Sequence, residues 1–509
     1  MRVDDTPEAG IEMRPAHAAA DASVSEPAES PKRKPSLGSG YLRVGALDPR
    51  SVKVLTVLGF AVPVVAYIAF LQHYQVNALW QDQWDDVPVI RQSFLHFPDW
   101  SSLWIQHVDN RIFFPNLIVL ALAHTLSYNI TVEEYIGALL LFAATALFIW
   151  SHKRRSPHTP LLFYCPVAFL TLTFAQWQNT IWGFQMAWYL VVFALALTIA
   201  LLDRPRFGWP IFVAAVLVAV VGSFSSLQGL LIWLVGLVIL YHRRRAPSTF
   251  IAWIVAAGLT TILYFHNFVS SAAFNPSKTV LNHPYFAVKF FIFSLGDVVG
   301  LQEQQPKQGN GWVMAFGVVI FVLAVLVVFR WGLRRDEYSG APIGIAMILF
   351  GLLFDALITQ GRLFIGYFAA SQSRYTTNDV LVLAGIYLTV LSGAPFRVPR
   401  KSEGRIAGAA WKSWRAVAWI WSNVERLDRF PLRGVVLVAI VIQIVFSLHF
   451  AFGGARVLHQ HEVTAASVTR NIKDEPPGKV VSDLYFVQSD GWIREQTQFL
   501  QEHHLSLFG

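Results

Sequence analysis

The sequence has few charged residues and a single cysteine. Asp, Glu, Lys and Arg make up 14% of its 509 residues, whereas a soluble globular domain carries about 25%. Hydrophobic residues account for 54% of the chain, and the mean hydropathy is +0.46. Cys165 has no second cysteine to pair with, so the chain forms no intramolecular disulfide. We therefore expect an all-α protein that crosses a membrane many times.

The first fifty residues lack any apolar run. Residues 1–50 are rich in Ala, Pro, Glu, Ser and Lys, a composition typical of a disordered tail. The first apolar run begins near Val54, so we expect a signal anchor rather than a cleavable signal peptide. Basic residues precede this anchor. They place the N-terminus in the cytoplasm and the next segment in the periplasm of a bacterial inner membrane.

The positive net charge of +8 does not indicate nucleic-acid binding. Lys and Arg are concentrated in short clusters between apolar runs, which is the pattern of cytoplasmic loops. Residues 152–155, 203–206 and 242–245 are such clusters. With these clusters inside, about 11 crossings are predicted, at 54–72, 135–150, 159–176, 186–202, 209–223, 229–241, 249–266, 311–331, 341–358, 377–394 and 434–453.

Two further apolar runs, 112–127 and 285–300, are expected to lie along or dip into the outer surface. If either crossed, the next basic cluster would lie outside. We expect a first periplasmic loop at 73–133 and a transmembrane domain over 51–453. A basic, Trp-rich amphipathic segment over 395–433 is predicted to lie on the inner leaflet. Residues 454–509 then form a periplasmic tail, which is too short for much of a core of its own.

The most informative stretch is the acidic segment, residues 80–86. On an α-helix Asp82, Asp85 and Asp86 would share one face, with Trp84 among them. Clustered carboxylates repel one another and can leave one with a raised pKa, which suits proton abstraction. Taken alone, a solvated acidic loop beside an aromatic belt is the better interpretation. The other outer-side residues reverse that preference.

The second outer segment, 176–185, contains four amides and two indoles and no charge. Amides and indoles suit sugar binding, because hydroxyls hydrogen bond to amides and sugar rings pack on aromatic faces. An aromatic belt with satisfied amides would give the same pattern. The candidate sugar- or acceptor-binding residues are Trp84, His107, Asp109, Asn110, Gln178, Asn179, Trp182 and Gln185.

Two arginines, Arg362 and Arg374, are predicted to lie on the outer side near the membrane surface, against the charge rule. A guanidinium binds phosphate through two parallel hydrogen bonds, so a lipid-linked phosphate would explain them. The alternatives are a salt bridge to Asp355, Asp379 or the acidic segment, or snorkelling. Because charge at this depth is costly, we favour a functional role.

The order of these elements resembles the GT-C superfamily of membrane glycosyltransferases, which use polyprenyl-phosphate-linked sugars. The resemblance covers the architecture of roughly residues 50–400. Asp82, Val89-Ile90-Arg91-Gln92 and Phe97-Pro98-Asp99-Trp100 are similar to the first loop of the aminoarabinose and mannose branch. The stretch 111–117 departs from that branch, because it has one proline where the branch has an adjacent pair. Ser373-Arg374-Tyr375 and the stretch 505–508 resemble uncharacterised bacterial members.

The resemblance implies an inverting transfer from a polyprenyl-phosphate sugar to a glycan, lipid or protein acceptor. It assigns Asp82 as the general base, with Asp85 and Asp86 as residues that orient it or bind a cation. The residues assigned to the donor phosphate are Arg374, Arg362, Arg111 and Tyr375. A divalent cation is used in one branch of the superfamily, but we predict neither a metal nor another cofactor here.

Two other functions fit parts of the sequence. An O-antigen polymerase or ligase also uses outer-side arginines, but usually relies on a large late periplasmic loop. A lipid-carrier flippase or transporter predicts charged residues in the middle of several crossings. Asp355 is the main residue of that kind in the predicted crossings, which favours chemistry at one membrane surface.

Overall fold

The computed structural model describes residues 49–96, 99–269, 276–301, 309–333, 340–392 and 432–509. In these residues the regular structure is helical except for a two-stranded antiparallel sheet. The tail predicted for 1–50 and the amphipathic segment predicted for 395–433 lie almost wholly outside the described residues.

Eight helical segments of the described chain are long and apolar enough to cross a membrane, so the protein is an all-α polytopic membrane protein. Four of these contain one long helix each: α1 (Pro49–Tyr74), α5 (Ile130–Arg155), α11 (Pro247–Phe265) and α14 (Gly311–Leu333). A fifth, Leu161–Ile181, is broken into η2 (Leu161–Tyr164), α6 (Cys165–Thr171), η3 (Phe174–Gln176) and α7 (Trp177–Ile181). The others are η4 (Gly183–Gln185) with α8 (Met186–Leu202), α15 (Ala341–Arg362) with η7 (Leu363–Ile365), and α19 (Leu432–Arg470).

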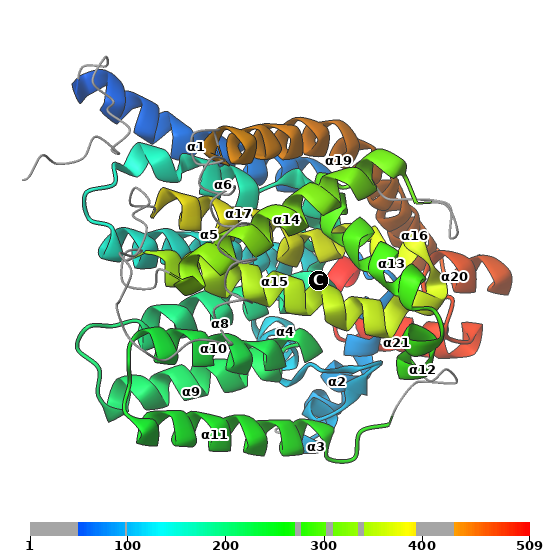
Figure 1. Ribbon diagram of the computed structural model, residues 1–509. Coiled ribbons are helices and arrows are strands. Elements are labelled where there is room, and N and C mark those ends of the chain that lie inside the picture. Colours follow the sequence, from blue (N-terminus) through cyan, green and yellow to red (C-terminus); the bar gives the residue numbers. More distant parts are fainter. Residues whose placement is uncertain (1–48, 97–98, 270–275, 302–308, 334–339, 393–431) are drawn as a thin grey trace, which may run out of the picture. The chain divides into compact units, whose positions relative to one another are not determined.

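Three of the predicted crossings fall outside this set of eight. Two are short: α9 (Trp209–Ser223) has 15 residues, and η5 (Leu227–Leu230) leads into α10 (Leu231–His242) with 12. At 1.5 Å per residue both are shorter than the roughly 30 Å hydrocarbon core. The third, α17 (Ser373–Leu391), carries Arg374, Asn378 and Asp379 in its first two turns. In Figure 1, α9, α10 and α11 lie side by side.

The two runs expected not to cross form short helices. Both α4 (Phe113–Thr125) and α13 (Pro284–Gly296) have 13 residues, which gives about 20 Å against the roughly 30 Å that a crossing needs. The turn η6 (Asp297–Val299) follows α13, and α12 (Pro276–Asn282) precedes it. A four-residue helix, α16 (Tyr367–Ala370), separates α15 from α17.

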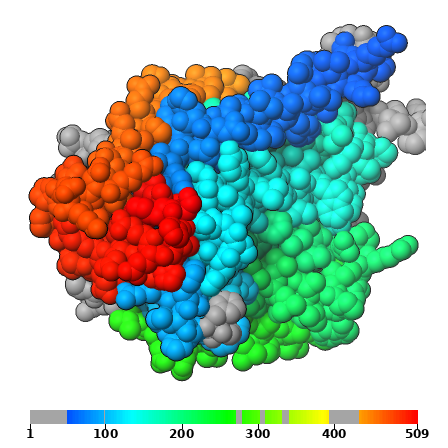
Figure 2. Space-filling view, turned by 180° about the vertical axis from the view of Figure 1, so that it is seen from behind, coloured from blue at the N-terminus to red at the C-terminus, as the bar shows by residue number. Residues whose placement is uncertain are grey.

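The C-terminal segment and the first outer segment share one hydrophobic core. The first outer segment forms η1 (Gln81–Asp85), α2 (Asp86–Leu95), α3 (Trp100–Leu103), β1 (Gln106–His107) and β2 (Asn110–Arg111). The long helix α19 continues beyond residue 453 and is followed by α20 (Pro477–Asp483), α21 (Asp490–Glu502) and η8 (Ser506–Phe508). Trp84 and Ile90 are buried with Leu484 and Leu500 in this core. Figure 2 shows the red C-terminal residues against blue residues of the first outer segment.

The expectation that the tail is too short for much of a core of its own stays a prediction. Its buried apolar residues belong to the same cluster as residues of α2 and α4. This joint core positions the start of α2 against the C-terminal segment, which matters for the site described below.

Close packing of α15 on α17 depends on two glycines that face each other. A Cβ added to Gly385 would overlap the carbonyl oxygen of Gly344, and one added to Gly344 would overlap that of Gly385. Small residues of this kind allow helix backbones to approach within a membrane protein. Since α17 carries Arg374 at its start, the contact also sets the position of that side chain.

We expect Gly385→Ala to destabilise the protein by about 1–3 kcal/mol, because the new methyl group meets backbone atoms that cannot move away independently. The matched control is Gly258→Ala in α11, where an added Cβ meets no atom within 4 Å. There alanine gains helix propensity and should be neutral or slightly stabilising. Thermal unfolding of the purified proteins in one detergent measures both. Equal midpoints for the two variants would contradict this account of the α15–α17 contact.

Candidate active site

Two carboxylates of the acidic segment face one histidine. The Nδ1 atom of His107 lies 3.0 Å from Asp85 Oδ2, and its Nε2 atom lies 3.7 Å from Asp82 Oδ2. Residues 81–85 form a 3₁₀-helix rather than an α-helix, and with three residues per turn the side chains at i and i+3 are eclipsed. Asp82 and Asp85 are therefore aligned toward the same imidazole.

A tight hairpin presents His107. The register of β1 and β2 pairs His107 with Asn110, so Val108 and Asp109 form the turn. Val108 has a φ of 49°, which is a strained conformation for a β-branched residue. The imidazole also packs edge-on against Phe184, with ring centroids 4.9 Å apart. The hairpin thus holds the ring between the acidic segment and residues 183–185.

The His107 imidazole is a cation at neutral pH. Burial alone would lower its pKa, but hydrogen bonds to Asp82 and Asp85 and their negative charges outweigh burial and raise the pKa of His107 to about 9. Asp82 remains the more accessible of the two acids, with 36% of its side chain exposed against 30% for Asp85.

Asp86 does not share the face of the other two acids. It begins α2, is 3% exposed, and accepts a hydrogen bond of 2.8 Å from the Tyr128 hydroxyl. Burial is the largest cause that raises the pKa of Asp86 to about 7; the Tyr128 hydrogen bond opposes it and the charge of Asp85 adds to it. The expected three-carboxylate face is thus wrong at this position, because the 3₁₀ turn rotates Asp86 into the core.

A residue from the C-terminal segment completes the acidic pair. The Tyr485 hydroxyl donates a hydrogen bond of 2.8 Å to Asp85 Oδ2, the same oxygen that faces His107. The backbone N–H of Gln81 donates to the carbonyl of Leu484, next to Tyr485. Sequence reasoning missed Tyr485, since a lone tyrosine 400 residues away carries no local signal. The spacing of apolar residues in the tail was the one sign in the sequence that this segment packs against another part of the chain.

Arg111 and Asn110 are used to hold the hairpin in place. The Arg111 guanidinium donates to the carbonyls of Trp104, Tyr264 and His266, and the residue is 4% exposed. The Asn110 side-chain oxygen accepts hydrogen bonds from Ser226 and Leu227. The Arg111 guanidinium, which the sequence assigned to a phosphate, thus donates to backbone carbonyl groups instead. The side-chain carbonyl of Asn110 accepts hydrogen bonds from the turn after α9.

The predicted sugar-binding segment, 176–185, is packed inside the protein. All its residues except Phe184 are buried, and Trp84 of the acidic segment is 0% exposed. Asn179 donates to the Arg374 carbonyl and to the Thr377 hydroxyl, while Gln178 accepts from the Arg374 N–H. Trp84, Gln178, Asn179, Trp182 and Gln185 are buried in this structure, and their assignment to sugar or acceptor binding stays a prediction.

The same segment connects the acidic pair to Arg374. Trp182 packs on Trp80 with ring centroids 5.1 Å apart, and Phe184 packs on His107. Gln178 and Asn179 hold the first turn of α17, as described above. Within the part of the chain that the structure describes, the Arg374 guanidinium makes no hydrogen bond or ion pair. It lies 5.6 Å from the ring centroid of Tyr375, which is itself buried.

Arg362 joins this side of the molecule through the hairpin. Its Nη2 atom lies 3.8 Å from Asp109 Oδ2, and both side chains are about one-third exposed. Asp109 follows His107 by two residues, so one hairpin contacts both the acidic pair and an outer arginine. Among the described residues, no group of three His, Cys, Asp or Glu side chains is arranged to hold a metal ion.

We expect the His107 contacts to make stability pH-dependent above neutrality. The pKa of His107 is raised from its ordinary 6.5 to about 9, so its contribution is complete below pH 6.5 and is lost as pH rises through 9. The pKa of Asp86 is also raised, to about 7, so its contribution to stability decreases as pH rises from its ordinary pKa to about 7. That change is nearly complete before His107 titrates. The stability difference between the wild type and His107→Gln should therefore be up to about 3 kcal/mol at pH 6.5 and small at pH 10.

The measurement is the unfolding midpoint of both proteins from pH 6.5 to 10 in one detergent. Taking the difference between the proteins cancels tyrosine and lysine titrations that both share. A difference that stays constant over this range would contradict the assigned ion pairs.

Among solved structures, comparison finds a likeness to a membrane protein of known structure. No family model matches the chain, and no curated protein sequence matches it. The structure is similar to the crystal structure of ArnT from Cupriavidus metallidurans bound to undecaprenyl phosphate, at 15% sequence identity and a TM-score of 0.43. The match covers 84% of this chain and 81% of that chain. At this identity and TM-score the likeness decides nothing about activity, so the function below is inferred from the site.

Proposed function

We propose that the protein transfers a sugar, with inversion, from a polyprenyl phosphate to a lipid, glycan or protein acceptor at the periplasmic face of the inner membrane. One observation carries the proposal. A partly exposed carboxylate, Asp82, lies beside an imidazolium. The buried segment 176–185 connects this group to Arg374, whose guanidinium has no ion pair among the described residues. A base and a phosphate-binding cation are the two groups that such a transfer needs.

The reaction balances without another reactant. The acceptor hydroxyl oxygen forms a bond to the anomeric carbon while the bond from that carbon to the phosphate oxygen breaks. The proton of the hydroxyl passes to the Asp82 carboxylate, and polyprenyl phosphate leaves with one more negative charge. Arg374 neutralises that charge, and Arg362 assists it from the end of α15.

The other residues of the site position this base. The Nε2 atom of the His107 imidazole lies 3.7 Å from Asp82 Oδ2 and so holds the carboxylate in position. Asp85 is held at one oxygen by both His107 and Tyr485, which fixes the ring against Asp82. This arrangement needs no metal or other cofactor for the proton transfer. The short motifs that resemble GT-C enzymes support the same assignment of Asp82.

A transporter is the second candidate, and one observation favours it. Asp355 and Asp379 are buried, and both oxygens of Asp355 and one of Asp379 have no hydrogen-bond partner in the described residues. Intramembrane carboxylates commonly mark ion pathways. However, Asp355 precedes Arg362 by seven residues and Asp379 follows Arg374 by five, which is about 10 Å or less along each helix. They thus lie close to the outer cations, as expected for surface chemistry.

We expect Asp82→Asn to reduce transfer by at least about 100-fold, because the amide cannot accept the proton. Insertion should stay near wild type. The unfolding midpoint should fall by no more than that of His107→Gln, since Asp82 is one of the two carboxylates that face the imidazolium. Lipid extracts of a strain that lacks the protein identify the donor as the polyprenyl-phosphate sugar that accumulates. Complementation of that strain then measures each variant. The matched control is Asp99→Asn, which removes an exposed carboxylate from the same segment and still caps α3.

Retained turnover in Asp82→Asn would remove Asp82 as the base. Normal lipid-linked sugars in the deletion strain, with a defect in Asp355→Asn instead, would favour the transporter.

Replacement of Arg374 tests the phosphate site separately. Arg374→Gln should lower the rate at saturating donor by about 100-fold, because the leaving phosphate loses its cation. Arg374→Lys should recover part of that rate, since a point charge remains but the two-point contact does not. Arg91→Gln is the control, because Arg91 is on the same side and pairs with Glu495 on the surface. Similar rates for Arg374→Gln and Arg91→Gln would exclude this role for Arg374.

A further inference from the structure

The side of the molecule away from the acidic pair carries a cluster of arginines that the proposed reaction does not use. From residue 135 to residue 296 the sequence contains one acidic residue, Asp203. The same stretch places eight basic residues in three turns, at 153–155, 204–206 and 243–245. The first set is the last turn of α5, and the other two follow α8 and α10. The charge rule assigns all three to the cytoplasm.

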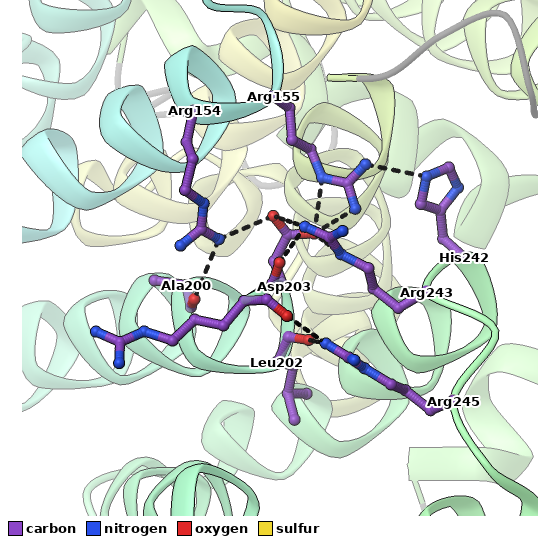
Figure 3. Close-up of polar contacts among 9 residues, drawn as sticks. Arg154, Arg155, Ala200, Leu202, Asp203, His242, Arg243 and Arg245 are labelled. Carbon is purple, nitrogen blue, oxygen red and sulfur yellow. Dashed lines mark hydrogen bonds and ion pairs between the residues drawn. The ribbon is translucent and has the colours of Figure 1, made fainter. Parts of the chain in front are cut away.

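The three turns meet at the Asp203 carboxylate, as Figure 3 shows. Asp203 is 0% exposed. Its Oδ2 atom lies 3.0 Å from Arg154 Nη2, and its Oδ1 atom lies 2.7 Å from Arg155 Nε and 3.0 Å from Arg243 Nε. Burial alone would raise the pKa of Asp203, but hydrogen bonds and the charges of Arg155 and Arg243 outweigh it and lower that pKa. The carboxylate is therefore an anion that ties three helix ends together.

One carboxylate cannot neutralise the four guanidinium groups gathered here. We call Arg154, Arg155, Arg243 and Arg245 the inner arginine cluster. Arg245 donates to the carbonyls of Leu202 and Arg204, which carry no net charge. Among the described residues, Asp203 is the carboxylate that contacts this cluster, and the buried Nε atoms of Arg154 and Arg245 remain without a hydrogen-bond partner.

Aromatic side chains place this cluster at the depth of the lipid headgroups. Arg154 lies over the ring of Trp150, 4.5 Å from its centroid, and Arg245 lies over Phe207, 3.9 Å from its centroid. Trp150 is 45% exposed and Trp209, at the start of α9, is 60% exposed. Exposed tryptophans at the ends of apolar helices are typical of the membrane–water interface.

We propose that the inner arginine cluster binds the phosphate of an anionic phospholipid of the cytoplasmic leaflet. The charge excess selects an anionic headgroup over a zwitterionic one, since each arginine near such a surface contributes about 1 kcal/mol. Arg155 and Arg243 hold Asp203, and Arg154 and Arg245 contact the headgroup from the exposed side. The lipid would complete the junction of α5, α8 and α10. This site is independent of the proposed transfer reaction.

The test uses the full-length protein in nanodiscs of phosphatidylcholine alone or with phosphatidylglycerol. We expect phosphatidylglycerol to raise the unfolding midpoint of the wild type and to remain bound in native mass spectrometry. Arg154→Gln and Arg245→Gln should each retain roughly fivefold less of it. In phosphatidylcholine Arg154→Gln should lower the midpoint, because Arg154 also binds Asp203. Arg245→Gln leaves all three arginine contacts to Asp203 in place, so its midpoint should stay closer to wild type.

The matched control is Arg206→Gln, which removes an exposed arginine from the turn after α8 without touching the cluster. It should retain phosphatidylglycerol as the wild type does. An equal loss in Arg206→Gln would show a diffuse positive surface and overturn the site. The wild type alone also decides the question if a variant fails to fold. Equal midpoints in the two lipid mixtures, with no retained phosphatidylglycerol, would overturn the proposal.

Discussion

One oxygen of Asp85 connects three parts of the chain that are far apart in sequence. His107 from the hairpin and Tyr485 from the C-terminal segment both contact Oδ2, while Asp85 itself ends η1. A partly buried carboxylate requires such partners, because leaving it unpaired would cost more than each contact contributes. The hairpin, the acidic segment and the tail are therefore held in one arrangement, and the exposed carboxylate of Asp82 is placed by that arrangement.

Charged side chains are paired differently at the two ends of the helices. At one end, two carboxylates surround a single histidine, and the cation is supplied by a raised pKa of His107. At the other end, arginines surround the single carboxylate of Asp203. Both follow from the apolar composition of the helices between them, which confines most charges to the surfaces. The first end has the groups for proton transfer, and the second has an excess of cations suited to anionic headgroups.

Several site residues could be predicted from the sequence and several could not. Asp82, Asp85 and His107 lie in one outer segment, so their proximity follows from chain order and a short hairpin. Asp86 was misplaced because local sequence does not distinguish a 3₁₀ turn from an α-helix, and the difference of one residue decides which face is buried. Tyr485 was missed because its partner is 400 residues away, and contacts at that separation depend on the shared core.

The sequence by itself determined the class of the protein, because long apolar runs with basic residues at their ends form membrane helices. It also indicated that the acidic segment and the basic clusters at 152–155, 203–206 and 242–245 lie at opposite ends of the helices. Tertiary structure decided which polar groups are available. Arg111 and the amides of Gln178 and Asn179 are of the same types as residues that bind substrates, yet packing uses them for backbone and helix contacts. The same amides contact the backbone of Arg374, whose guanidinium has no hydrogen bond or ion pair to any residue that the structure describes.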